Sequence, residues 1–67
     1  MLVIVKDRQN CDEAFEASLA YNVFHSEDRR CSVIKLSIGG MICSFESVAE
    51  ITQKINKALS LGRQHES

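Results

Sequence analysis

Proline and tryptophan are both missing from this 67-residue sequence, and only three glycines occur. Proline and glycine are the residues that interrupt helices and strands most strongly, so nearly all of the chain can adopt regular structure. Neither charge sign is in marked excess, because eight basic residues stand against nine acidic ones. The composition therefore shows no overall electrostatic attraction to nucleic acid or to an anionic membrane.

Long hydrophobic runs are absent as well. The apolar opening, MLVIV, is too short for a signal-peptide core or for a membrane span. Three cysteines, Cys11, Cys31 and Cys43, cannot all pair within one chain, and none belongs to a C-x-x-C motif. We therefore expect a cytoplasmic protein with free thiols and no membrane contact.

What is present is the composition of an ordinary globular domain, with 45% hydrophobic and 25% charged residues. A domain of this size buries only about 60% of the surface that its unfolded chain exposes, so it has little stability to spare. Small domains often compensate with a disulfide, a metal or a second subunit. We expect one compact domain over residues 1–62 and a frayed tail over residues 63–67.

The first half of the chain predicts a strand and a helix. LVIVK, at residues 2–6, is apolar at every position but the last, which is typical of a central strand covered on both faces. Asn10 followed by Glu13 resembles a helix capping box, and acidic residues occupy the turn after it. A helix is therefore expected from about Cys11 to about Phe24.

A glycine pair, Gly39 and Gly40, interrupts the alternating run SVIKLSIGGMICSFES. A phosphate-binding glycine loop would lead into a helix, whereas a second strand-like segment follows here. If both glycines form the centre of a type I′ turn, three apolar pairs share one face of a β-hairpin. The other face is mixed and includes Val33 and Ile42. The predicted apolar pairs are Ile38 with Met41, Leu36 with Cys43, and Ile34 with Phe45.

A second helix is predicted after the hairpin. Ser47 followed by Glu50 forms an S-x-x-E capping box, and Glu50 has the spacing for an ion pair with Lys54. Gly62 is the expected left-handed residue that ends this helix. Its buried stripe is expected to comprise Val48, Ile51, Ile55, Ala58 and Leu59.

These elements predict an α/β (α+β) mini-domain in the order strand, helix, strand, strand, helix. Both helices are expected on one face of a three-stranded mixed sheet, and a right-handed crossover through the first helix would make strands 2–6 and 32–38 parallel. The first helix carries more apolar surface than one core-facing stripe needs. Surplus apolar area indicates burial between chains, although a small domain can also leave some apolar atoms in water. The expected protein interface comprises Phe15, Leu19, Tyr21, Phe24, Val33 and Ile42.

The cysteines and histidines are the candidates for chemistry. Cys31 follows Arg29 and Arg30, whose charges favour a reactive thiolate, although a solvent-facing thiol is the simpler interpretation. Cys43 is expected to be a small hydrophobe on the apolar hairpin face. The candidate metal ligands lack the paired short loops of zinc sites, and neither histidine has an organised acid or nucleophile nearby, so no metal, cofactor or catalytic residue is expected. The residues considered for these roles are Cys11, His25, Cys31, Cys43 and His65.

We therefore expect a small non-enzymatic protein-binding module, a regulator or inhibitor that acts as a homodimer, of a size that would suit a virus or mobile element. The alternative is a nucleic-acid-binding regulator that uses basic residues of the hairpin and second helix. Its weakness is that the predicted polar sheet face carries no aromatic residues on which bases could stack. The basic residues of this alternative are Arg29, Arg30, Lys35, Lys54 and Lys57.

Overall fold

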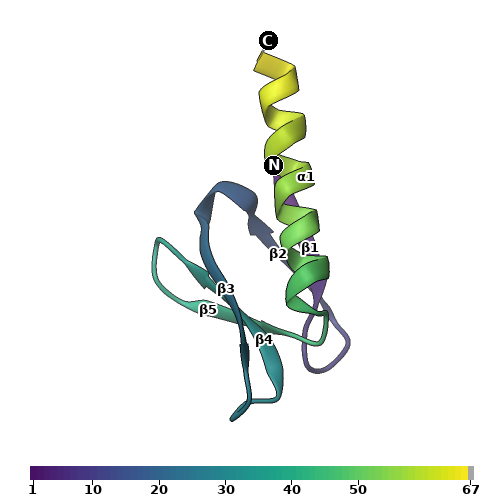
Figure 1. The fold of residues 1–67 in the computed structure, drawn as a ribbon, viewed down its shortest axis with the longest axis vertical. Helices are drawn as coiled ribbons and strands as arrows, with labels where there is room; N and C mark the ends of the chain where they lie inside the picture. The colour runs from purple at the N-terminus through teal and green to yellow at the C-terminus, as the bar shows by residue number, and fades with distance from the viewer. Residues whose placement is uncertain (67) are drawn as a thin grey trace.

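Five strands and one long helix form the fold in the computed structural model, which describes the backbone of residues 1–66 and the side chains of residues 1–61. The strands make two antiparallel sheets, one of two strands and one of three (Figure 1). The elements are β1 (Leu2–Lys6), β2 (Asp12–Glu16), the 3₁₀ turn η1 (Ala17–Leu19), β3 (Ala20–Ser26), β4 (Cys31–Leu36), β5 (Met41–Ser44) and α1 (Val48–Glu66). The predicted arrangement of two helices on a three-stranded mixed sheet, with a parallel crossover, is therefore wrong.

The segment predicted as the first helix forms β2, η1 and β3 instead. Phe15 and Ala17 lie two residues apart and both enter the core, which is the period of a strand and not of a helix. Tyr21, Val23 and Phe24, which are β-branched or aromatic, favour the extended backbone of β3. Pairing with β1 and β4 therefore decided the conformation, which a short helical pattern could not reveal.

The apparent capping box is part of the turn between β1 and β2. Asn10 lies in this turn with a positive φ of 62°, and β2 follows it where a helix was expected. The Asp7 carboxylate accepts backbone N–H groups from Gln9 at 2.8 Å and from Cys11 at 2.9 Å. Asp7 is therefore the residue that closes this turn, in the manner of an Asx turn.

The hairpin is confirmed, but its predicted register is wrong, and Gly39 and Gly40 are not the two central residues of its turn. The Gly39 N–H donates to the Leu36 carbonyl at 3.0 Å, which places Ser37 and Ile38 at the centre. Both glycines have positive φ, 98° and 88°, and the chain reverses between β4 and β5. Ile34 lies opposite Ile42, and Val33 lies opposite Cys43. The Ser37 N–H donates to the Leu19 carbonyl at 2.8 Å, which takes Ser37 out of the hairpin ladder and lengthens the loop. The shift by three residues moves Cys43 from the face of Ile34 to the face of Val33, and it moves Ile42 to the face of Ile34.

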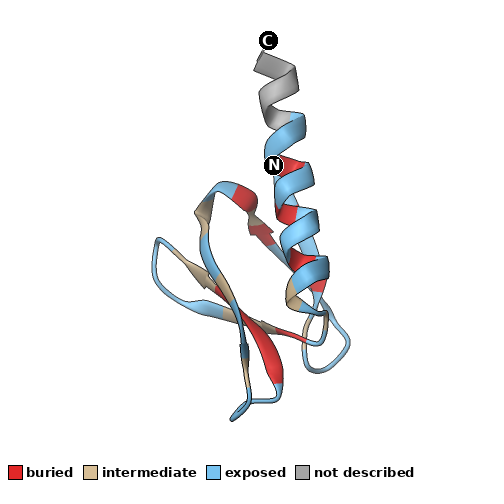
Figure 2. Ribbon diagram, viewed as in Figure 1, coloured by how far each residue is buried: buried red, intermediate tan, exposed pale blue. Residues whose placement is uncertain are grey.

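The core lies where α1 and the inner faces of both sheets meet, as the buried residues in Figure 2 show. The Ser47 hydroxyl accepts the Glu50 N–H at 3.1 Å, so the predicted N-cap is confirmed. The helix continues to Glu66, so the predicted end at Gly62 is wrong, and the tail expected at residues 63–67 lies outside the residues whose side chains are described. The core residues are Val3, Val5, Phe15, Ala17, Ile34, Ile51, Ile55 and Ala58.

One buried serine joins the two sheets. Ser44, at the end of β5, is 0% exposed, and its hydroxyl donates to the Lys6 carbonyl of β1 at 2.6 Å. The same hydroxyl accepts the Glu46 N–H at 3.1 Å. The Phe45 N–H also donates to the Lys6 carbonyl, at 3.2 Å. Three hydrogen bonds thus gather at the point where β5 meets β1.

β1 lies at an edge of its sheet, which corrects the prediction that it is central and covered on both faces. Val3 and Val5 are buried, whereas Leu2 and Ile4 are 65% and 55% exposed. Side chains from outside the sheet bond its free edge: Glu46 accepts the Lys6 N–H at 2.8 Å, and Lys54 donates to the Ile4 carbonyl at 3.0 Å. Lys54 also pairs with Glu46 at 2.5 Å, in place of the predicted Glu50. Among the residues that the structure describes, no helix is long and apolar enough to cross a membrane.

Candidate functional site

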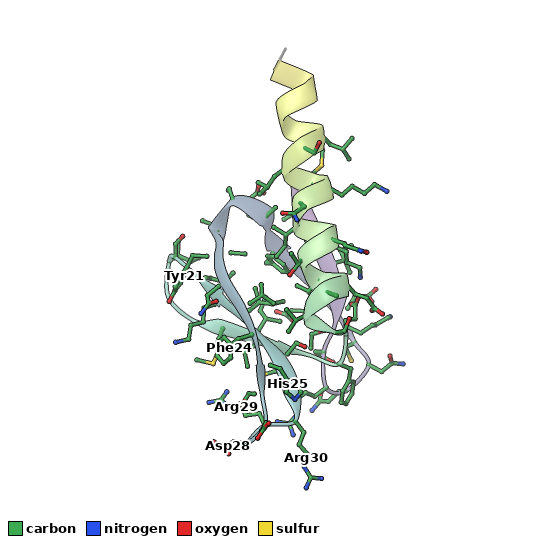
Figure 3. The ribbon with its side chains drawn as sticks, in the orientation of Figure 1. Tyr21, Phe24, His25, Asp28, Arg29 and Arg30 are labelled. Atoms are coloured by element: carbon green, nitrogen blue, oxygen red, sulfur yellow. The ribbon has the colours of Figure 1, made fainter. Side chains whose placement is uncertain are left out.

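The face of the three-stranded sheet that points away from α1 brings aromatic and basic side chains together (Figure 3). The register places Phe24 and Val33 opposite each other on this face, while Val23 and Ile34 pair on the face toward the core. We call this surface the outer face, and its accessible members are Tyr21, Phe24, Arg29, Lys35 and Met41.

Phe24 and Lys35 form the centre of the outer face. The Lys35 ammonium lies over the Phe24 ring, 5.9 Å from its centroid, which is the distance of a weak cation–π contact. The ring remains 36% exposed. A flat apolar surface and a positive charge are therefore presented side by side.

Tyr21 adds a second ring at the start of β3. The pairing of β3 with β4 shifts by one residue between Ala20 and Asn22, so Tyr21 sits in a β-bulge. Bulges re-aim side chains out of the regular alternation. Tyr21 is consequently 64% exposed and is carried by the same sheet edge as Phe24.

Arg29 reaches across the sheet from the turn between β3 and β4. Its backbone N–H is held by the Ser26 hydroxyl at 3.3 Å. Its guanidinium Nη1 lies 3.4 Å from Met41 Sδ and 3.8 Å from Cys43 Sγ on β5. Arg30 follows in the same turn with a φ of 54° (Figure 3). The turn thus supplies two positive charges, one of them held over the sulfur atoms, beside the negative charges of Glu27 and Asp28.

The residues expected at a protein interface divide into three groups. Tyr21, Phe24 and Val33 come together on the outer face, although Val33 is buried beneath its neighbours. Phe15 lies in the core. Leu19 and Ile42 are half-buried, and Ile42 packs against the core. The outward helical stripe to which four of them were assigned does not form, because residues 12–26 are not α-helical.

The basic residues expected to bind nucleic acid fall into two separate groups. Arg29, Arg30 and Lys35 belong to the hairpin of β3 and β4. Lys54 and Lys57 belong to α1 and face β1, where they line a shallow groove of about 220 Å³. Apolar side chains form the rest of this groove, namely Met1, Leu2, Val3, Ile4, Ala58 and Leu61.

The thiols differ from their expected places. Cys31 is buried and not solvent-facing, and burial raises the pKa of its thiol, with a smaller contribution from a hydrogen bond to Cys43. Cys43 is half-buried on the outer face. Cys11 is exposed in the turn between β1 and β2. Among the described side chains, no group of three His, Cys, Asp or Glu residues is placed to hold a metal ion.

Sequence reasoning missed that the outer face is aromatic, and it did not single out Met41. The alternation in the segment AYNVFHS could have revealed the aromatic face. In a strand, Asn22 and Phe24 lie on one face and Val23 lies on the other. No family model matches the chain, and no curated protein or solved structure is significantly similar to it.

Proposed function

We propose that the chain is a small, non-enzymatic cytoplasmic regulator that acts as a homodimer and binds single-stranded nucleic acid through its outer face. The observation that carries this proposal is the exposure of Tyr21 and Phe24 on a sheet face that also presents Lys35 and Arg29. Reducing conditions in the cytoplasm suit three free cysteines.

The physical basis is the match between this surface and an unpaired strand. Unstacked bases stack on exposed aromatic rings, and each such contact contributes about 1–3 kcal/mol. Lysine and arginine beside the rings attract the phosphates. The hairpin of β3 and β4 is net positive although the whole chain is mildly acidic, because Arg29, Arg30 and Lys35 outnumber Glu27 and Asp28 there.

Fluorescence anisotropy with a labelled single-stranded RNA of mixed sequence tests the proposal, with the corresponding duplex as a comparison. We expect binding at low salt that weakens as salt rises, and a loss of roughly 5- to 150-fold in Phe24→Ala. Lys35→Gln should lower the slope of log K against log salt by about one. Lys57→Gln, on the distant α1 groove, is the matched control and should bind normally.

Two results would overturn the nucleic-acid proposal. One is the absence of binding to single-stranded RNA or DNA at low salt. The other is an equal loss in Lys35→Gln and Lys57→Gln, which would mean that general charge and not the outer face is responsible.

A protein partner with an acidic surface is the second candidate. The supporting observation is that Tyr21, Phe24, Met41 and Arg29 are residue types enriched at the centres of protein interfaces. The chain would then be a regulator or inhibitor of that partner. Capture from the native host by the wild type but not by folded Tyr21→Asp, with no nucleic acid required, would favour this candidate.

The homodimer is supported by apolar surface at the opposite side of the molecule. Leu2, Ile4 and Leu61 are exposed around the groove between β1 and α1, on a chain with little core to spare. A second copy would cover this surface by a symmetric contact. We expect sedimentation at micromolar concentration to give a dimer, and Ile4→Lys to give a monomer; Gln53→Lys, an exposed polar position on α1, is the control.

A further inference from the structure

Two cysteines lie together on the outer face. Cys43 of β5 is opposite Val33 of β4, and Cys31 precedes Val33 by two residues, so the register makes the cysteines diagonal neighbours on one face. A hydrogen bond between their thiols is one of the causes that raise the pKa of Cys31, after burial itself. The two side chains therefore lie beside each other on the outer face.

The surroundings of the two thiols are unequal. Cys31 is 3% exposed, whereas Cys43 is half-buried and lines a shallow hollow of about 260 Å³ with Asp7, Arg8 and Gln9. The Arg29 guanidinium is 3.8 Å from Cys43 Sγ. A small oxidant can thus reach Cys43, and the positive charge of Arg29 lies close to where hydroxide departs when this sulfur attacks peroxide.

We propose that Cys43 and Cys31 are a redox-active pair that hydrogen peroxide converts to a disulfide between β4 and β5. Cys43 would be the sulfur that peroxide oxidises, and Cys31 the thiol that resolves the product. This inference goes beyond the binding function and does not depend on which partner the outer face takes.

The chemistry proceeds in two steps. The Cys43 thiolate attacks one peroxide oxygen, the O–O bond breaks, and the departing hydroxide takes a proton to become water, which leaves a sulfenic acid on Cys43. Cys31 then attacks the Cys43 sulfur, its S–H proton leaves, the S–O bond breaks, and a second water is released. Overall, two thiols lose two electrons and two protons, and one peroxide is reduced to two waters.

The disulfide would change the outer face. Cys43 Sγ would turn toward Cys31, so the contact that now holds Arg29 over β5 would be lost. Diagonal strand neighbours are further apart than the Cβ spacing of a disulfide, so β4 and β5 must draw together as the bond forms.

Peroxide treatment of the folded chain, followed by alkylation of the remaining thiols and peptide mapping, tests the pair. We expect a Cys31–Cys43 disulfide within single chains, formed at the same rate in Cys11→Ser and reversed by dithiothreitol. Cys31→Ser should accumulate oxygen adducts on Cys43 and form no internal disulfide. Arg29→Gln should slow the oxidation several-fold while its circular dichroism spectrum stays that of the wild type.

Three outcomes would overturn the proposal. The first is that Cys11 is oxidised while Cys31 and Cys43 stay reduced. The second is that the Cys31–Cys43 bond appears only in urea, where the register no longer places the thiols together. The third is that Cys31→Ser and Cys31→Ala both leave Cys43 unoxidised, since Cys43 is the proposed site of first attack.

Discussion

Replacing Ser44 with alanine should weaken the joint between the two sheets. The substitution removes the hydroxyl that donates to the Lys6 carbonyl and accepts the Glu46 N–H. The Lys6 carbonyl keeps the Phe45 N–H as a donor, but the Glu46 N–H loses the partner that the structure gives it. An unsatisfied buried donor costs about 1–3 kcal/mol, so Ser44→Ala should lose about that much unfolding free energy.

That loss is large for a chain of this length. At the usual stability per residue, a chain of 67 residues has an unfolding free energy of roughly 3–10 kcal/mol. A loss of about 2 kcal/mol lowers the Tm of so small a domain by about 8–16 °C. Urea unfolding followed by circular dichroism, at one fixed protein concentration, measures the change.

Ser32→Ala is the matched control. Ser32 is also buried, and it lies directly opposite Ser44 in the pairing of β4 with β5. The structure gives its hydroxyl no hydrogen bond among residues 1–61, so Ser32→Ala should lose clearly less unfolding free energy than Ser44→Ala. The reasoning is refuted if Ser44→Ala unfolds at the wild-type urea midpoint, or if Ser32→Ala loses as much stability as Ser44→Ala.

Three further predictions concern the core, the β1 edge and the hairpin loop. Ile51→Ala should lower the unfolding free energy measured in urea by about 2–5 kcal/mol, because this side chain is fully buried. Leu59→Ala should be nearly neutral, because Leu59 is exposed. Equal effects would contradict the placement of α1. Burial acts to raise the pKa of Glu46, but hydrogen bonds from Lys54 and from the Lys6 N–H outweigh it and lower the pKa. The stability that Glu46 contributes should therefore be complete above the unfolded pKa of about 4.3 and should disappear as pH falls through the folded pKa. Urea unfolding of the wild type and of Glu46→Gln at several pH values tests this. A difference in unfolding free energy that stays constant from neutral to acid pH would count against this ion pair. Gly39→Ala should cost about 1–2 kcal/mol in thermal unfolding from backbone strain alone, since φ is +98° and no atom lies within 4 Å of the added Cβ; an unchanged Tm would argue against that conformation.

Local signals in the sequence were sufficient for the elements that depend on local chemistry. The Ser47 cap begins α1 as predicted, Leu2–Lys6 is a strand, and a hairpin follows with Gly39 and Gly40 in its loop. Each depends on a few neighbouring residues, such as a side-chain oxygen that meets an N–H three positions later.

The errors arose where distant contacts decided the structure. Residues 12–26 fit both a helical and a strand pattern, and pairing with β1 and β4 selected the strand. The hairpin register depended on the Ser37 N–H, which bonds Leu19 of another element. The outer face followed from both: only when β3 is a strand do Phe24 and Lys35 become neighbours, so the aromatic surface could not be predicted before the sheet was known.

The contacts of Lys54 and Glu46 with the edge of β1 bear on the order in which the chain can complete its fold. β1 is synthesised before the residues that bond its free edge, because Glu46 follows Lys6 by 40 residues and Lys54 follows Ile4 by 50. Until those residues emerge, Leu2 and Ile4 belong to an unprotected sheet edge, the kind of surface that recruits strands from other molecules. The lysine that reaches Ile4 from α1 thus also acts as a safeguard against aggregation, and it takes effect only after α1 has been synthesised.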